Sequence, residues 1–182
     1  MVRRLLEILI ANLRVTLDDS RLESLIGMKN VNINFYPICR NPELTVGAGR
    51  HSDMGTLTVL LQDNAGGLYI KVEEYKLDSR KEEWIEIPPI PSALVINVGD
   101  SLEILSNRRY KSAEHRVRTS SKQSRVSIPV FTAPRPTEKI GPLPHLAELG
   151  GGALYREVIF QEYMDNFFGH TPEGKKRLIL SK

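Results

Sequence analysis

Between residues 30 and 135, regularly spaced turn signals divide the chain into short strand-like runs, and this pattern limits the folds open to it. Val31, Ile33 and Phe35 alternate with polar residues, and a strongly apolar run follows at 57–62. Alternation with a period of two is typical of strands, whereas helices need a period near 3.6. About six to eight such runs with turns between them favour an all-β sandwich or barrel. We therefore expect a mainly β fold: a double-stranded β-helix (jelly roll) core with flanking α-helices.

Gly, Pro and Asn residues delimit the individual strands. The runs at 57–62 and 68–72 flank the turn Asp63–Gly67 and are predicted to form a hairpin. Residues 76–83 are predicted to form a charged, mobile tip. Pro129 favours an edge strand or a bulge, because proline cannot donate to a sheet ladder. Strands are expected at 31–36, 46–52, 57–62, 68–72, 84–87, 93–98, around His115 and at 125–132.

Helical patterns lie at both ends of the chain. The first helix starts at once, with apolar residues at helical spacing: Leu5, Ile8, Leu9 and Leu13. Ser20 is the expected N-cap of a second helix at 21–26, which Gly27 ends. Further helices are expected at 101–106 and 155–168, with a loop at 134–144.

Composition excludes several classes of function. The 25 Lys+Arg residues barely exceed the 22 Asp+Glu residues and are scattered, which argues against a nucleic-acid partner. No apolar run is long enough to cross a bilayer, so no membrane partner is expected. Cys39 is the single cysteine, so there is no internal disulfide, and a reducing, cytoplasmic location is expected.

His51 and Asp53 are two residues apart, so on an extended strand both side chains leave the same face. An imidazole and a carboxylate placed in this way can bind one metal ion, and His115 is the candidate third ligand. Two histidines and one carboxylate form the facial triad of non-haem Fe(II) oxygenases. His145 and His170 have no ligand pattern around them and are expected on the surface.

Arg125 and Ser127 also share one face of a predicted strand, as a clamp for a small dicarboxylate would require. An inward-facing guanidinium is costly to bury unless it holds something. Zinc would accept the same three metal ligands in a catalytic site. A hydrolytic zinc site, however, leaves the arginine and the serine unexplained, so iron is favoured.

The metal triad and the Arg-x-Ser pair resemble the motifs of the plant 2-oxoglutarate and Fe(II)-dependent dioxygenases. Three further segments also resemble that family: Asn34-Phe35-Tyr36-Pro37, residues 95–100 and residues 111–117. The resemblance runs from about Val31 to Phe168. Within the family, residues 46–62, 111–119 and 131–134 are most similar to the feruloyl-CoA ortho-hydroxylases, which start coumarin synthesis.

The resemblance implies a function and a role for each site residue. It implies Fe(II) on His51, Asp53 and His115, with no catalytic residue beyond this metal site. It implies 2-oxoglutarate as co-substrate, O2 as oxidant and ascorbate as a supporting reductant. The implied substrate is an aromatic phenylpropanoid, with feruloyl-CoA as the leading candidate and scopoletin-type coumarins downstream. The remaining implied contacts are Arg125, Ser127, Tyr36 and Asn34 with 2-oxoglutarate, and Phe131 with the aromatic substrate.

Two alternatives stay open. One is a hydroxylase of a finished coumarin or a flavonoid; the other is a truncated, non-catalytic binding domain. The resemblance also implies a family N-terminal segment ahead of the point where this chain begins. We expect one monomeric domain in three parts: N-terminal helices that pack on the barrel at 1–29, the jelly-roll core at 30–135, and a loop with a C-terminal helix at 136–182.

Overall fold

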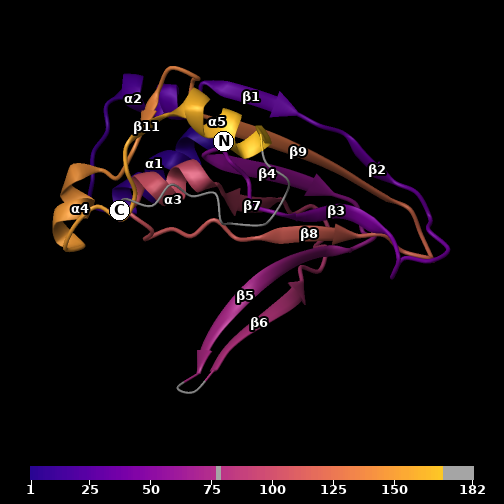
Figure 1. The fold of residues 1–182 in the computed structure, drawn as a ribbon. Helices are drawn as coiled ribbons and strands as arrows, with labels where there is room; N and C mark the ends of the chain where they lie inside the picture. The colour runs from indigo at the N-terminus through magenta and orange to yellow at the C-terminus, as the bar shows by residue number, and fades with distance from the viewer. Residues whose placement is uncertain (77–78, 170–182) are drawn as a thin grey trace.

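Two antiparallel sheets face each other in the computed structural model, which describes residues 1–76 and 79–169 (Figure 1). The major sheet has the order β1-β9-β4-β7, with β2 also paired to β9; the minor sheet has the order β3-β8-β5-β6. This arrangement confirms the predicted mainly β, jelly-roll fold. The major-sheet strands are β1 (Met28–Val31), β2 (Asn34–Tyr36), β4 (Leu57–Gln62), β7 (Val95–Val98) and β9 (Arg125–Ala133). The minor-sheet strands are β3 (Val46–His51), β5 (Leu68–Lys76), β6 (Ser79–Glu86) and β8 (His115–Arg118).

The predicted hairpin between residues 57–62 and 68–72 is wrong. Strand β4 pairs with β7 and β9 in the major sheet, whereas β5 pairs with β6 and β8 in the minor sheet. The turn at 63–67 therefore crosses from one sheet to the other. The hairpin that does form joins β5 to β6, and its pairing continues to Lys76 opposite Ser79. The predicted charged tip is thus mostly strand, and residues 77–78 lie outside the described residues.

Pro129 lies in the middle of the major sheet, not at an edge. It is paired with Leu60 of β4 on one side, and on the other side its carbonyl accepts from the Asn32 N–H at 3.1 Å. In an antiparallel strand the N and O of one residue point to the same neighbour. The missing N–H of Pro129 therefore faces the interruption between β1 and β2, where no ladder bond is needed.

The two N-terminal helices are α1 (Val2–Asn12) and α2 (Asp19–Leu25), close to the predicted bounds. Leu6 and Ile10 are the most deeply buried residues of α1. The predicted Leu5, Leu9 and Leu13 belong to or pack against the same cluster, whereas Ile8 is 46% exposed. The N-cap of α2 is Asp18, whose side chain accepts from the Arg21 N–H at 2.7 Å, and not Ser20. A carboxylate at this position also interacts favourably with the helix dipole.

The C-terminal third differs most from the prediction. The expected loop at 134–144 contains β10 (Lys139–Ile140), and α4 (Pro144–Leu149) follows it. The expected helix at 155–168 begins only at Phe160, as α5 (Phe160–Gly169), because Val158–Ile159 form β11 and pair with β10. The predicted helix at 101–106 is α3 (Asp100–Leu105).

Most of the hydrophobic core lies outside the space between the sheets. One cluster joins α1, α2, α3 and α4 to Leu57 of β4, and a second joins Ile104 of α3 to the C-terminal segment. Among the described residues, a small cluster centred on Leu60, Leu68 and Val117 lies between the sheets. No helix in the described ranges has the length and hydropathy needed to cross a membrane.

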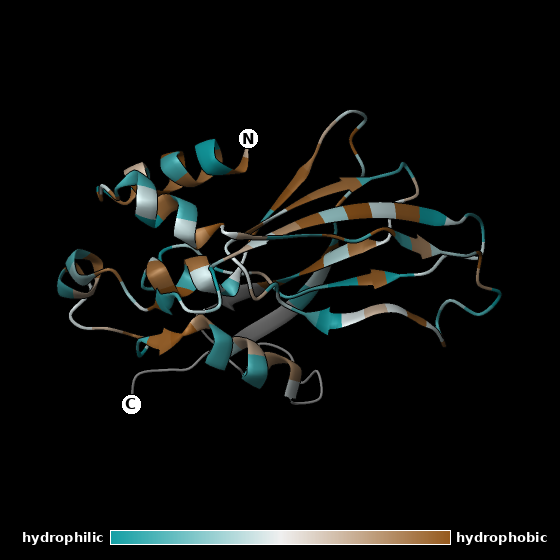
Figure 2. Cartoon of the chain, turned by 90° about the horizontal axis from the view of Figure 1, so that it is seen from above, coloured by the Kyte–Doolittle hydropathy of each residue, from teal (hydrophilic) through white to brown (hydrophobic). Residues whose placement is uncertain are grey.

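The hydropathy colouring shows hydrophilic and hydrophobic residues interspersed along the strands (Figure 2). In and next to β2, however, the apolar residues are exposed. Ile33 is 75% exposed and Phe35 is 64% exposed, whereas Asn34 and Tyr36 line a cavity between the sheets. The interior of this part of the barrel is therefore polar, as a binding site requires.

Candidate metal and co-substrate site

The three predicted metal ligands come together at one end of the barrel. His51 is the last residue of β3 and is paired across the minor sheet with His115, the first residue of β8. Their ring centroids are 4.3 Å apart. The ligand atoms of His51, His115 and Asp53 all lie within 4.8 Å of one another, and His115 Nε2 is 3.7 Å from Asp53 Oδ1. This spacing allows all three side chains to bind the same face of one metal ion, which leaves its other positions open.

Backbone carbonyls orient both imidazoles. His51 Nδ1 is 2.7 Å from the Gly49 carbonyl, and His115 Nδ1 is 3.1 Å from the Ala113 carbonyl. When each Nδ1–H donates to its carbonyl, each Nε2 lone pair is left for a metal, as is usual for histidine ligands. Burial, and to a smaller extent the neighbouring His115, lower the pKa of His51 below its ordinary value. The ring is therefore neutral at neutral pH, which is the form that binds metals.

Asn97 also belongs to this candidate site, although no sequence motif predicted a role for it. Its side-chain amide donates to Asp53 Oδ2 at 3.3 Å, from the middle of β7. An amide on the outer carboxylate oxygen fixes the orientation of a ligand carboxylate. The available signal was its position in the segment 95–100, which resembles the family, on the inward-facing side of an alternating strand.

Arg125 and Ser127 lie at the other end of the same space. Both are buried, and Arg125 Nη1 donates to Ser127 Oγ at 2.8 Å while Nη2 donates to Gln62 Oε1 at 3.1 Å. Arg125 Nε is buried without a hydrogen-bond partner among the described residues. Burial lowers the pKa of the guanidinium, and its centre lies 5.4 Å from the centroid of the Tyr36 ring. A buried cation with an unsatisfied N–H is the arrangement expected where an anion is to bind.

A single cavity of about 230 Å³ joins the metal triad to the arginine. All of the site residues expected from the sequence line it, including Asn34, Tyr36 and Phe131. Thr58, Asn97 and Ser127 add polar groups, and Leu60, Leu68 and Val117 add apolar ones. His145 is exposed on α4, as expected, and His170 lies outside the described residues.

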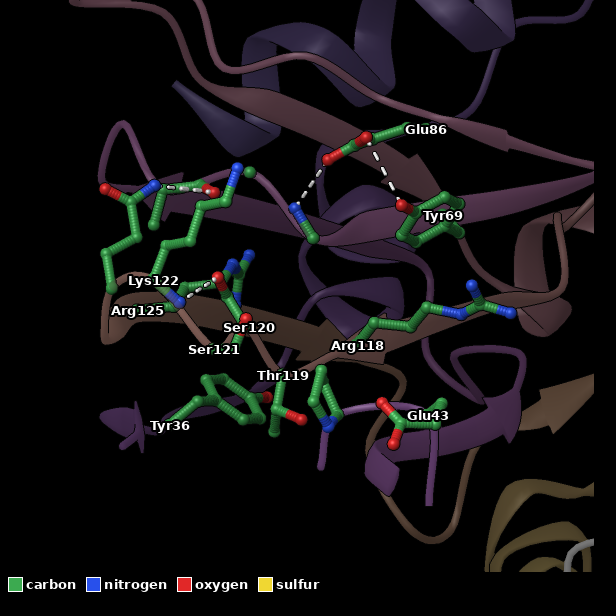
Figure 3. Close-up of a pocket in the computed structure, with 15 residues that line it drawn as sticks. Tyr36, Glu43, Tyr69, Glu86, Arg118, Thr119, Ser120, Ser121, Lys122 and Arg125 are labelled. Carbon is green, nitrogen blue, oxygen red and sulfur yellow. Dashed lines mark hydrogen bonds between the residues drawn. The ribbon is translucent and has the colours of Figure 1, made fainter. Parts of the chain in front are cut away.

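A second, larger pocket of about 440 Å³ shares only Tyr36 and Arg125 with this cavity (Figure 3). Its lining includes the cations Arg118 and Lys122 and the carboxylates of Glu43 and Glu86. Glu86 already accepts from the Gly67 N–H at 2.8 Å and from the Tyr69 hydroxyl at 3.3 Å. The metal triad is not part of its lining, so the smaller cavity is the candidate site.

The donor set fits Fe(II) with an anionic co-substrate. Two imidazoles and one carboxylate are borderline and hard ligands, as expected for a non-haem iron site with open positions. The unsatisfied Nε of Arg125 lies across the same cavity. The metal ligands and the arginine thus indicate that the cavity can hold a metal ion and a dicarboxylate together.

Comparisons with known proteins agree with this geometry. Residues 28–134 match the family described as the 2OG-Fe(II) oxygenase superfamily. The chain is 57% identical to scopoletin 8-hydroxylase of Arabidopsis thaliana and 51% identical to feruloyl CoA ortho-hydroxylase F6H1-1 of Ipomoea batatas. Both matches cover 100% of this chain but 49% of the relative. The chain therefore spans about half the length of the curated relatives it matches.

Solved structures show the same fold. The crystal structure of JOX2 in complex with 2OG, Fe and JA matches with a TM-score of 0.82 and 34% identity, covering 100% of this chain and 53% of that one. The dioxygenase for auxin oxidation from rice matches with a TM-score of 0.75 and 26% identity, over 94% of this chain and 56% of that one. The resemblance inferred from the motifs is thereby confirmed, and the chain belongs to the 2OG-Fe(II) oxygenase superfamily.

Proposed function

We propose that this chain is the catalytic part of a dioxygenase that uses Fe(II) and 2-oxoglutarate to hydroxylate an aromatic phenylpropanoid. The observation that supports this most is the single cavity with the His51–Asp53–His115 triad at one end and Arg125 at the other. Bound Fe(II) and 2-oxoglutarate supply the chemistry that activates O2 for insertion into a C–H bond. The protein's own residues bind, orient and shield the reactants.

Arg125 and Ser127 would hold the distal carboxylate of 2-oxoglutarate. The guanidinium offers a planar fork of donors, and charge-assisted bonds of this kind are stronger than neutral ones. Ser127 Oγ accepts from Arg125, so its own O–H can donate to the same carboxylate. Tyr36 and Asn34 line this end of the cavity and would contact the remaining oxygens.

Phe131 is the proposed contact for the aromatic substrate. Its half-buried ring faces the cavity from β9, two residues beyond Pro129. An aromatic ring at this position can stack on a phenyl or coumarin ring. The small apolar cluster around Leu60 and Leu68 limits water in the cavity, which strengthens the electrostatic contacts within it.

Two substrates are candidates. Feruloyl-CoA, hydroxylated ortho to its propenoyl chain, follows from the motif resemblance and from the 51% identity to a feruloyl CoA ortho-hydroxylase. A finished coumarin is favoured by the higher identity, 57%, to scopoletin 8-hydroxylase. We propose the coumarin as the first substrate to test and the CoA thioester as the second. A cytoplasmic, monomeric enzyme is part of the same proposal.

Anaerobic titration with Fe(II) and then 2-oxoglutarate tests the site. The metal chelate gives a visible charge-transfer band, which should appear with the unaltered chain and be absent in Arg125→Ala. Arg118→Ala is the matched control, since Arg118 lines the second pocket only. No band from a folded chain would favour the alternative of a non-catalytic binding domain. Turnover assays with scopoletin and with feruloyl-CoA then separate the two substrates.

A further inference from the structure

Helix α3 contacts the segments that carry Asp53 and His115 from outside the cavity, and it contains two buried carboxylates. Every residue of α3 is buried, and Asp100 and Glu103 are each only 1% exposed. Neither side chain lines the cavity that contains the metal triad. Burying a carboxylate is costly unless hydrogen bonds compensate for the lost hydration. The partners of these two groups therefore indicate what the helix does.

The N-terminus of α3 holds the loop that contains Asp53. Asp100 N–H donates to the Asp53 carbonyl at 2.7 Å, and Ser101 N–H donates to the Gly55 carbonyl at 3.0 Å. Ser101 Oγ donates to the Met54 carbonyl at 2.8 Å. The Asp100 side chain adds a fourth bond, because its Oδ2 accepts from Ser52 Oγ at 2.9 Å. First-turn N–H groups have no partner within a helix. Here the carbonyl groups of the loop at 53–55 accept from two of them.

Glu103 holds the segment that leads to the other histidine. Its Oε2 accepts from the Ser112 N–H at 2.6 Å, three residues before His115. Asp100 and Glu103 lie one helical turn apart, so a single rigid helix contacts both ligand-bearing segments. The distance between Asp53 and His115 thus depends on α3.

Two tyrosines from the C-terminal segment complete this arrangement. Tyr163 donates its hydroxyl to Asp100 Oδ2 at 2.8 Å, and Tyr155 donates to Glu103 Oε1 at 2.7 Å. Both rings are almost fully buried. Burial and Glu103 raise the pKa of Tyr155, so it remains a protonated donor. Each carboxylate is therefore held between a metal-ligand segment and a tyrosine.

We propose that Asp100 and Glu103 are positioning residues for the metal ligands, and that Tyr163 and Tyr155 fix these carboxylates separately. Tyr163 acts through Asp100 on residues 52–55, and Tyr155 acts through Glu103 on residues 112–115. The C-terminal segment in this way sets the geometry of a metal site that it does not touch. This inference rests on the proposed assignment of His51, Asp53 and His115 as metal ligands.

Hydrogen exchange and Co(II) binding, measured on the full chain, test the proposal together. Tyr163→Phe should speed amide exchange about fivefold at Asp100 and Ser101, whose N–H groups donate to the carbonyls of Asp53 and Gly55, and leave the Ser112 amide unchanged, as expected for one lost hydrogen bond. Tyr155→Phe should do the reverse. Each variant should also weaken Co(II) binding by about tenfold and shift the Co(II) visible spectrum. This is the low end of the loss caused by removing a direct partner of a metal ligand, because the tyrosines act through Asp100 and Glu103.

Tyr110→Phe is the matched control, because the Tyr110 hydroxyl donates to the Leu9 carbonyl of α1 at 2.9 Å and to neither carboxylate of α3. It should leave the exchange of the Asp100, Ser101 and Ser112 amides and Co(II) affinity unchanged. Faster exchange spread over the whole core, or equal effects of the three variants, would overturn the proposal. If the unaltered chain binds no Co(II), the metal assignment fails, while the segment-specific exchange still decides whether α3 positions the two segments.

Discussion

The two faces of the major sheet differ in a way that is unusual for a β-sandwich. On β2 and β9 the inward face presents Asn34, Tyr36, Arg125 and Ser127, and the outward face presents Phe35, whose partner is Val126. Half-buried strands normally direct their apolar residues inward. Here the inward residues line the candidate binding cavity, and Phe35 is 64% exposed on the outside.

Stability must therefore come from another part of the molecule. At the opposite end of the same sheet Leu57 is fully buried against α1 and α3, and the C-terminal segment forms its own buried cluster. The helix-covered end of the sheet is closely packed, and the candidate cavity lies along the inner face of the same strands. Functional sites often violate the local folding rules in this manner, with the cost met by packing elsewhere.

Removing a metal ligand should have the largest effect on binding. His115→Ala should weaken Co(II) or Fe(II) binding by at least about 100-fold, more than loss of an outer partner would. Isothermal titration measures the change, and His145→Ala on the exposed face of α4 is the control. An unchanged metal affinity would show that His115 is not a metal ligand.

A methyl group in the loop that follows Asp53 should destabilise the fold. A Cβ on Gly55 would lie 2.3 Å from the Thr132 carbonyl oxygen of β9, whereas one on Gly49 would meet nothing within 4 Å. Gly55→Ala should lower the free energy of unfolding by about 1–3 kcal/mol, as overpacking does. Gly49→Ala should leave it nearly unchanged in urea titrations. Equal losses of unfolding free energy in the two variants would show that the loop containing Gly55 is not closely packed on β9.

Replacing the Arg125 guanidinium by an ammonium group should weaken the binding of 2-oxoglutarate without affecting the binding of the metal. Arg125→Lys keeps the charge but loses the fork of donors, so 2-oxoglutarate affinity should fall by about tenfold. Metal affinity and unfolding free energy should change little, and Arg118→Lys serves as the control. If both lysine variants bound 2-oxoglutarate as well as the unaltered chain does, Arg125 would not be the carboxylate clamp.

The outer face should tolerate polar substitution with the smallest effect. The triple change Ile33→Thr, Phe35→Thr and Val126→Thr keeps residues that favour strands but removes exposed apolar surface. Metal and 2-oxoglutarate affinities should stay within about twofold, as expected for sites that share no partners. Binding of a fluorescent hydrophobic dye should decrease. A tenfold loss of 2-oxoglutarate affinity would show that the two faces are coupled.

The sequence by itself determined the alternating strands and the residues that share a face. His51 with Asp53, and Arg125 with Ser127, could be paired from spacing alone, because the side-chain period of an extended chain is two. The turns between strands were equally visible, since Gly, Pro and Asn act through local backbone geometry. His115 was found from residue type and the motif around it.

Only the tertiary structure decided which strands pair and which face is the inside. The turn at 63–67 suits a hairpin, yet β4 already has a neighbour at each edge, so the chain crosses to the minor sheet. The start of α5 depends on β11 pairing with β10, some twenty residues earlier in the chain. The roles of Asn97 and of α3 depend on contacts between segments far apart in sequence. Such pairings are settled by packing over the whole domain, which no local pattern contains.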